Sequence, residues 1–223
     1  MTHIVGHLLP TYHLNKKLIK FVLISFTMFL LFSCVGCEKA NTNDEKVITT
    51  ETAISLLGME KEELFDTFDG LLEERSENPD ILELSSKMKY NENAVGIAFE
   101  LLNGRLFRIQ YNFGEEADDA FSFALESYSK IISKYGESDT YESLPNRIEG
   151  LDVNLYLSDN IYERKEYWIG TDVDFAEIVP KEYENSKRVD LGIGINKIPA
   201  DKTITMVYIG GIINSINTTK LPN

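Results

Sequence analysis

The sequence predicts an α+β domain with a mostly antiparallel sheet, in which an N-terminal helical pair and one long helix cover one face of the sheet. Helical periodicity occurs in two short segments near residues 50 and 60 and in one long segment that ends near residue 135. Strand-like alternation fills a hairpin before the long helix and several segments after it. This order of elements is typical of an α+β domain.

Two short helices are expected first. A capping hydroxyl at Thr49 or Thr50 precedes an apolar set, and Gly58 then ends the helix. A second helical pattern follows at residues 59–68. The charged segment Glu73–Asp80 contains an Asn-Pro pair and is predicted to be a loop.

A β-hairpin is predicted from Val95 to Tyr111. A two-residue turn at Asn103-Gly104 would place Phe99 opposite a polar residue, whereas a three-residue loop from Leu102 to Gly104 keeps apolar residues opposite one another. The pairs in that register are Val95 with Tyr111, Ile97 with Ile109, and Phe99 with Phe107. The sequence therefore favours the three-residue loop, with Gly104 in the left-handed conformation as part of a G1 bulge.

A long helix is predicted from about Glu115 to Tyr135, because apolar residues recur there at steps of three and four. Acidic residues crowd its first turn and Gly136 follows its end, as the helix dipole and a C-cap favour. Four strands are expected after it: Leu151–Leu157, Glu163–Gly170, Val189–Asn196 and Thr203–Ile212. The last is apolar on both faces and is therefore expected to be central or covered.

The alternating glycines Gly192 and Gly194 leave one face of their strand with little bulk. Either a close-packed helix or a ligand would explain this flat face.

The N-terminal segment has the order of an export signal. Lys16, Lys17 and Lys20 precede an apolar run over residues 21–32, and this run is shorter than the roughly 20 residues that a transmembrane helix needs. The residues that follow, Leu31-Phe32-Ser33-Cys34, resemble the lipobox of bacterial lipoproteins. The resemblance covers residues 16–37 and implies a diacylglyceryl anchor on the outer, extracytoplasmic face of the cell membrane.

Two cysteines are candidates for the lipid. Cys34 has Leu31 at the expected apolar position and Ser33 before it, although Phe32 is bulkier than the motif prefers. Cys37 is the alternative, because Val35 and Gly36 fit locally and a polar tail begins directly after it. We expect lipidation at Cys34. Residues 1–33 are then the signal peptide, residues 34–48 a lipidated cysteine with a polar tether, and residues 49–223 a single domain.

Composition and charge exclude several kinds of function. Residues 1–33 contain three lysines and no acidic residue, so residues 34–223 hold 19 of the 22 basic and all 36 acidic residues, a net formal charge of −17. Such a chain is unsuited to nucleic acid, whose binding depends on Lys and Arg. The three histidines, at positions 3, 7 and 13, all lie in the signal segment, so the mature chain lacks His-based catalysis and the commonest metal ligand. The sequence predicts no cofactor and no metal site.

The densest aromatic stretch is the candidate binding surface, and it comprises Tyr156, Tyr162, Tyr167 and Trp168. Exposed Tyr and Trp are favoured anchors in recognition, but aromatic residues also dominate protein cores. Asp172 and Asp174 resemble the start of a calcium loop, but Ala176 stands where a third oxygen ligand belongs, so a solvated Asp-x-Asp is the better reading.

The sequence thus favours a non-enzymatic, membrane-anchored lipoprotein whose domain binds another envelope protein or ligand. A small carboxylate-dependent hydrolase is the alternative, since that chemistry needs only two acids at a set separation. The opening helical segment, Gly58-Met59-Glu60-Lys61-Glu62-Glu63-Leu64, resembles that of small helix-helix-sheet envelope lipoproteins and β-lactamase-inhibitor-type proteins over about a dozen residues.

Overall fold

The computed structural model describes residues 48–139, 148, 152–158, 162–175, 178, 181, 187–199 and 202–215. All of them belong to one compact unit, Asn43–Asn223. The predicted signal segment, Cys34, Cys37 and the tether up to residue 47 lie outside the described residues.

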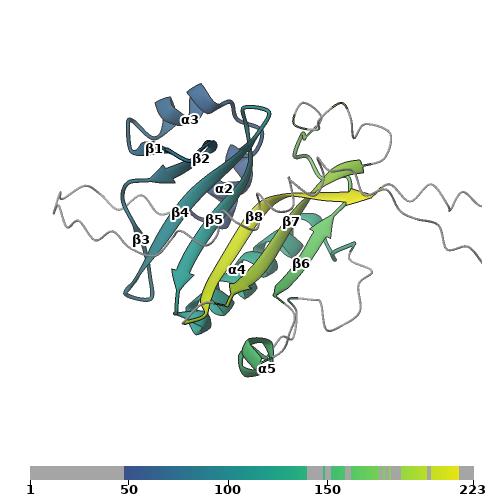
Figure 1. Cartoon of the computed structure of the whole chain (residues 1–223). Helices are drawn as coiled ribbons and strands as arrows, with labels where there is room; N and C mark the ends of the chain where they lie inside the picture. The colour runs from purple at the N-terminus through teal and green to yellow at the C-terminus, as the bar shows by residue number, and fades with distance from the viewer. Residues whose placement is uncertain are drawn as a thin grey trace, which may run out of the picture. The chain divides into compact units, whose positions relative to one another are not determined.

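An eight-stranded antiparallel sheet organises the described residues (Figure 1). The strands are β1 (Leu72–Arg75), β2 (Asn78–Leu84), β3 (Met88–Tyr90), β4 (Asn93–Leu102), β5 (Arg105–Gly114), β6 (Glu163–Trp168), β7 (Lys187–Ile198) and β8 (Ile204–Ser215). They follow the order β1-β2-β4-β5-β8-β7-β6, and β3 pairs with β4. The α+β class with a mostly antiparallel sheet is therefore confirmed. The strand that was expected to be central, β8, lies between β5 and β7.

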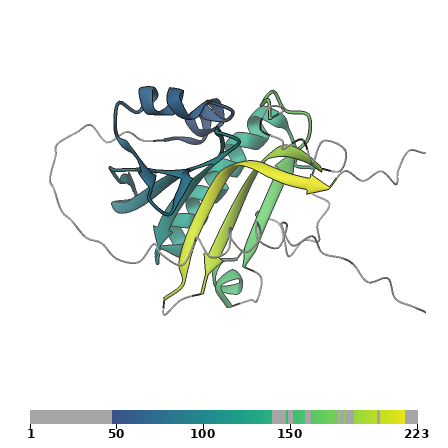
Figure 2. The same ribbon diagram turned by 45° about the horizontal axis from the view of Figure 1, so that its top comes forward.

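Four helices accompany this sheet in the described part of the chain: α2 (Thr50–Leu56), α3 (Lys61–Thr67), α4 (Ala117–Tyr135) and α5 (Val153–Ser158). The longest, α4, contacts β5, β7 and β8, and α2 contacts both β8 and α4. Figures 1 and 2 show α4 behind the sheet, and no described helix crosses the opposite face. The buried residues of α4 and the odd-numbered residues of the central strands form the core between these layers.

The register predicted for the β4–β5 hairpin was wrong by two residues. The turn is the two-residue Asn103-Gly104, with φ values of 52° and 74°, so both residues are left-handed. Leu101 then pairs with Leu106, but a bulge follows, and beyond it Phe99 pairs with Ile109. The bulge adds one residue to β5 and so returns the apolar residues to a common face, as the alternation requires.

The predicted loop Glu73–Asp80 is instead a hairpin of β1 and β2 at one edge of the sheet. Its charged residues are mostly exposed, while Leu72 and Leu82 are buried. Charged side chains are common on edge strands because they prevent pairing with other chains. The charges therefore indicated an edge position rather than a loop.

The predicted strand Leu151–Leu157 is also wrong, since residues 153–158 form helix α5. The alternation placed Tyr156 on the polar side, yet Tyr156 is fully buried while Leu157 is 38% exposed. A short apolar pattern does not by itself separate strand from helix. Asp152 stands directly before α5, at a position where Asp favours a helix start.

Candidate functional site: the polar face of the sheet

The two faces of the central strands differ in chemistry because side chains alternate along each strand. Odd-numbered residues such as Tyr111, Val207 and Ile193 are buried in the core with α4. Even-numbered residues of β4, β5, β8 and β7, together with odd-numbered residues of β6, lie on the other side. We call this side the polar face and define it as Gly96, Ala98, Glu100, Arg108, Gln110, Asn112, Glu163, Lys165, Tyr167, Arg188, Asp190, Gly192, Gly194, Asn196, Met206, Tyr208, Gly210, Ile212 and Asn214.

Strand pairing arranges the polar face in three rows that cross five strands. The rows are Glu100, Arg108, Gly210, Gly192 and Tyr167; then Ala98, Gln110, Tyr208, Gly194 and Lys165; then Gly96, Asn112, Met206, Asn196 and Glu163. Each row joins residues from β4 to β6, and thus from segments up to about 110 positions apart in the sequence. Pairing of distant strands, rather than any local motif, creates this surface.

Tyr208 lies at the centre of the polar face and is buried. Its ring covers Gly194 so closely that a Cβ at that position would overlap the ring. Beyond Gly194, the Tyr208 hydroxyl donates a hydrogen bond of 2.9 Å to Oε1 of Glu163, and Lys165 Nζ lies 3.2 Å from Glu163 Oε2. Burial and the negative charge of Glu163 together raise the pKa of Tyr208 well above its ordinary value. The phenol therefore remains a hydrogen-bond donor at neutral pH.

Arg108 covers Tyr208 from the neighbouring strand. Its guanidinium lies 4.6 Å from the centre of the Tyr208 ring, and its Nε lies 3.6 Å from Oε2 of Glu100. Gln110 donates a hydrogen bond of 3.0 Å to the same oxygen of Glu100. Burial acts to lower the pKa of Arg108, but the nearby Glu100, Tyr208 and Glu163 together outweigh it, and the pKa is raised. Arg108 is therefore a permanent cation in contact with an aromatic ring.

A second polar group lies where β7 begins and β8 ends. Asp190 is 5% exposed, and its Oδ2 accepts hydrogen bonds from Nε of Arg188, at 2.8 Å, and from Nδ2 of Asn214, at 2.7 Å. Over the whole polar face, three carboxylates therefore accompany three cations. This balance contrasts with the net charge of −17 over residues 34–223.

The structure does not bring the four predicted aromatic residues into one surface. Tyr156 is fully buried beside Phe121, with a ring separation of 5.3 Å, and Trp168 is 2% exposed. The indole Nε1 of Trp168 donates a hydrogen bond of 2.8 Å to the carbonyl of Gly136. Tyr162 is 47% exposed just before β6, and Tyr167 is half-buried on the polar face. Only Tyr162 and Tyr167 are open to a partner.

Two acidic residues near the predicted aromatic stretch have structural contacts. Glu166 is fully buried, where it accepts hydrogen bonds from Ser138 Oγ and, at 2.9 Å, from the amide of Ile148. Asp172 accepts a hydrogen bond from the hydroxyl of Tyr135 and lies close to Lys134. The hydrogen bond from Tyr135, and after it the contact with Lys134, lower the pKa of Asp172. Across the described residues, no group of three or more His, Cys, Asp or Glu side chains could hold a metal ion.

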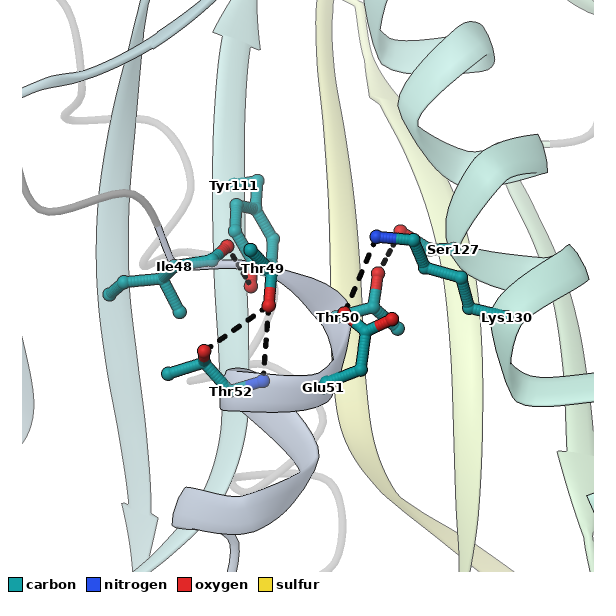
Figure 3. A network of polar contacts seen from close by, with 8 residues as sticks. All are labelled: Ile48, Thr49, Thr50, Glu51, Thr52, Tyr111, Ser127 and Lys130. Carbon is teal, nitrogen blue, oxygen red and sulfur yellow. Dashed lines mark hydrogen bonds and ion pairs between the residues drawn. The ribbon is translucent and has the colours of Figure 1, made fainter. Parts of the chain in front are cut away.

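A separate polar network fastens the start of the described chain to the core (Figure 3). Ile48 is 1% exposed, and its carbonyl accepts a hydrogen bond of 3.2 Å from the hydroxyl of Tyr111 on β5. Thr50 of α2 donates a buried hydrogen bond of 2.9 Å to Ser127 of α4. Nearer the surface, Lys130 Nζ lies 3.3 Å from Glu51 Oε2. We call this group the entry network, because the chain enters the domain here.

Comparisons with known proteins do not identify a function for this chain. No family model, curated protein or solved structure matches this chain. Among the helices that the structure describes, none has both the length and the apolar character required to cross a membrane.

Sequence reasoning missed the polar face, although part of its signal was visible. Arg108, Gln110 and Asn112 occupy alternate positions of β5, between Phe107, Ile109, Tyr111 and Phe113. That alternation marks one polar side of a strand. Because β5 proves to be an interior strand, flanked by β4 and β8, its polar side lies in the middle of the sheet.

Proposed function

We propose that this chain is a lipoprotein held by a covalent lipid on the extracytoplasmic face of a bacterial cell membrane, and that its domain binds another component of the envelope. The anchor is supported by the basic residues, short apolar run and lipobox-like segment of residues 16–37. The lipid would be attached to Cys34, with Cys37 as the alternative. The acidic chain itself would have little affinity for anionic lipid.

The polar face is the observation that carries the binding function. Charged and amide side chains lie there in the middle of a sheet, on the side opposite the core, and Gln110 and Asp190 among them are buried. In this proposal the N-terminal helical pair and the long helix cover the other face and act as a rigid support. Tyr167, half-buried at the end of one row, and the exposed Tyr162 would supply aromatic contact area.

A carboxylate-dependent hydrolase receives less support. A glycosidase needs one acid that protonates a leaving group and a second that acts as base or nucleophile. On the polar face Glu100, Glu163 and Asp190 each contact a neighbouring cation, and each also accepts a hydrogen bond from a neighbouring side chain. Each of the three carboxylates is therefore held by neighbouring side chains of the sheet.

Single cysteine substitutions test the anchor. We expect Cys34→Ala to abolish incorporation of labelled fatty acid and to release the protein from the membrane fraction, while the matched Cys37→Ala variant remains lipidated. The reverse result would assign the lipid to Cys37. If the variant with both cysteines replaced were still processed and retained like the wild type, the lipoprotein proposal would be wrong.

Site-specific photo-cross-linking tests the binding function. A photoreactive amino acid at position 167 samples the polar face, and the same group at position 125, where Leu125 is 37% exposed on α4, serves as the control. We expect a discrete adduct in intact cells from position 167 and none from position 125. Equal labelling from both positions would show random encounters and would count against a binding role for the polar face.

A further inference from the structure

The sheet has two outer edges, and they differ in how well they could accept another strand. At one edge, β1 has only four residues, carries the exposed Glu73 and Glu74, and has a bulge in its pairing with β2. Short, charged and bulged edge strands resist pairing with other chains. At the other edge, the six residues of β6 pair continuously with β7, from Glu163 to Trp168 (Figure 1). The regular edge of the described sheet is therefore β6.

Alternate residues of β6 direct their backbone groups away from β7. The carbonyl of Tyr162, one position before the strand, accepts a hydrogen bond of 2.9 Å from the amide of Lys197 on β7. In an antiparallel pair, residues that bond to the partner strand alternate with residues whose N–H and C=O point outward. The outward residues of β6 are therefore Glu163, Lys165 and Tyr167. In agreement, the carbonyl of Tyr167 accepts a hydrogen bond of 2.9 Å from Asp139, which lies outside the described strands.

Two of the outward residues leave their backbone groups open. Glu163 and Lys165 make their contacts through side chains, since Lys165 Nζ lies 3.2 Å from Glu163 Oε2 and Tyr208 donates to Glu163 Oε1. Within the described part of the chain, neither residue has a backbone hydrogen bond on the outer side of β6. The ion pair keeps both side chains over the polar face rather than across the edge. Open N–H and C=O groups in a regular row are a template for a further strand.

Exposed apolar side chains lie at both ends of this edge. Among the large hydrophobic residues that the structure describes, Tyr162 and Ile169 are the two most exposed, at 47% and 42%. Tyr162 directly precedes β6 and Ile169 directly follows it. Seven positions of extended chain separate them, which corresponds to about 23 Å. A partner strand of about seven residues laid along β6 would therefore span the distance between these two side chains.

The charges of β6 indicate which peptide fits this edge. Opposite charges that face each other on paired strands are favourable, and like charges are unfavourable. An added strand therefore fits best with an acidic residue opposite Lys165 and a basic residue opposite Glu163, two positions away on the same face. A second copy of β6 does not meet this condition. The antiparallel register that overlaps the whole strand would place Lys165 opposite the same lysine of the copy.

We propose that β6 accepts an extended segment of a partner polypeptide as an additional strand of the sheet. In this mode of recognition, main-chain hydrogen bonds supply affinity and alternate side chains supply specificity. The inference rests on the proposed binding function, because it specifies how the partner is held, but it does not rest on the lipid anchor. The added strand would extend two rows of the polar face by one residue each, beyond Glu163 and Lys165.

Proline at position 165 tests the outer side of β6 and leaves its inner side intact. Lys165→Pro removes the outward N–H, and an edge strand tolerates proline where that group faces solvent. Lys165→Ala is the matched control, because it removes the same side chain but keeps the N–H. The probe is a phage-displayed library of random peptides, selected on the full chain purified in detergent. We expect enriched peptides to carry an acidic and a basic residue two positions apart. They should bind Lys165→Pro about tenfold more weakly than Lys165→Ala, which corresponds to the loss of one hydrogen bond.

Amide hydrogen exchange on the unsubstituted chain gives an independent measurement. With a selected peptide bound, the amide of Lys165 should exchange at least about tenfold more slowly than in the free protein. The amide of Asn103, exposed in the turn between β4 and β5, is the control and should exchange at an unchanged rate. Thermal unfolding followed by fluorescence of Trp168, the single tryptophan, verifies that both variants at position 165 are folded. If Lys165→Pro does not fold, the exchange measurement alone decides.

Strand addition would be overturned by the absence of any enriched peptide, by equal affinity of the two variants, or by an unchanged exchange rate at Lys165. A dimer of the full chain that Lys165→Pro dissociates and Lys165→Ala preserves would also overturn it, because the occupant would then be a second copy.

The cross-link from position 167 separates this inference from the proposed function. In intact cells, Lys165→Pro should abolish the adduct and Lys165→Ala should keep it. An adduct that survives in both variants would rule out strand addition and leave the binding function in place. If position 167 gives no adduct even in the otherwise unsubstituted chain, the proposed function fails, while peptide selection still reports on the edge of β6.

Discussion

The ring of Tyr208 covers the backbone of Gly194 on the neighbouring strand, and the hydroxyl reaches past it to Glu163 on the next strand. One side chain thus links β8, β7 and β6 across the polar face. The lack of a side chain at position 194 is what allows this contact. The flat strand face at Gly192 and Gly194 is therefore explained by side chains of β8, since Ile212 covers Gly192 in the same way.

Gly194→Ala should destabilise the domain. The added methyl would displace the Tyr208 ring and weaken its hydrogen bond to Glu163, and overpacking of this kind costs about 1–3 kcal/mol. Urea denaturation followed by Trp168 fluorescence measures the free energy of unfolding. Gly96→Ala is the matched control, because a Cβ there would lie 3.7 Å from the Cβ of Asn112, an ordinary contact. Equal stability of the two variants would contradict the contact.

The hydrogen bond between Thr50 and Ser127 should couple α2 to α4 measurably. Ser127→Ala leaves the buried Thr50 hydroxyl without its acceptor and should cost about 1–3 kcal/mol. Adding Thr50→Val removes the hydroxyl that has lost its acceptor. The double variant should therefore lose less unfolding free energy than the sum of the losses in the two single variants. A double-mutant cycle from denaturation data gives the coupling energy. Strict additivity would show that the two hydroxyls do not interact.

The aromatic residues of the predicted binding stretch should divide into two classes when truncated. Tyr156→Ala removes a fully buried ring together with its hydroxyl contact to the carbonyl of Ile195, and should cost about 3–5 kcal/mol. Tyr162→Ala, at a site that is 47% exposed, should change stability by less than about 0.5 kcal/mol. Thermal unfolding followed by circular dichroism measures both. Similar losses in the two variants would contradict the burial pattern.

Alkaline pH should weaken the fold through the buried Tyr111 and the half-buried Tyr90. Burial raises the pKa of Tyr111 above its ordinary value of 10.0, and burial together with Glu126 raises the pKa of Tyr90 to about 12. Between pH 10 and 12 the unfolded chain releases these protons while the folded chain keeps them. The free energy of unfolding is therefore unaffected by these groups below pH 10 and falls as pH rises above it.

Tyr111→Phe provides the test of this pH dependence. The variant loses the hydrogen bond to Ile48, which should lower stability by about 1 kcal/mol below pH 10. Above pH 10 its stability should fall less steeply than that of the wild type, because one proton fewer is released on unfolding. Denaturation curves at several pH values give both slopes. Parallel slopes from pH 10 to 12 would show that Tyr111 ionises normally in the folded protein.

Alternation in the sequence predicted which side of a strand is buried, but not which residues are paired. The apolar residues Ile97, Phe99 and Tyr111 are buried together, as their spacing indicated. Their register depends on the bulge after Leu106. Many sequences are compatible with such a bulge. Its position is fixed by the tight Asn103-Gly104 turn at one end of β5 and by the pairing of β5 with β8 at the other. Local patterns do not contain that information.

Long-range pairing is also the reason why the polar face could not be predicted from the sequence. The row that joins Gln110, Tyr208 and Gly194 depends on β8 pairing with β5 on one side and with β7 on the other. Residues almost 100 positions apart thus become neighbours. Tyr156 shows the same limitation, because its burial depends on Phe121 of α4, whereas Asn154 and Ser158, two positions away on either side, are polar.

The entry network determines where mechanical load would act on this domain. The chain upstream of Ile48 joins the fold at a buried residue that is bonded to β5, two positions before a helix that is bonded to α4. A pull on the upstream segment would therefore be resisted at Ile48 by an interior strand and, two residues later, by the longest described helix. Under tension the domain should yield in a single event rather than by gradual peeling.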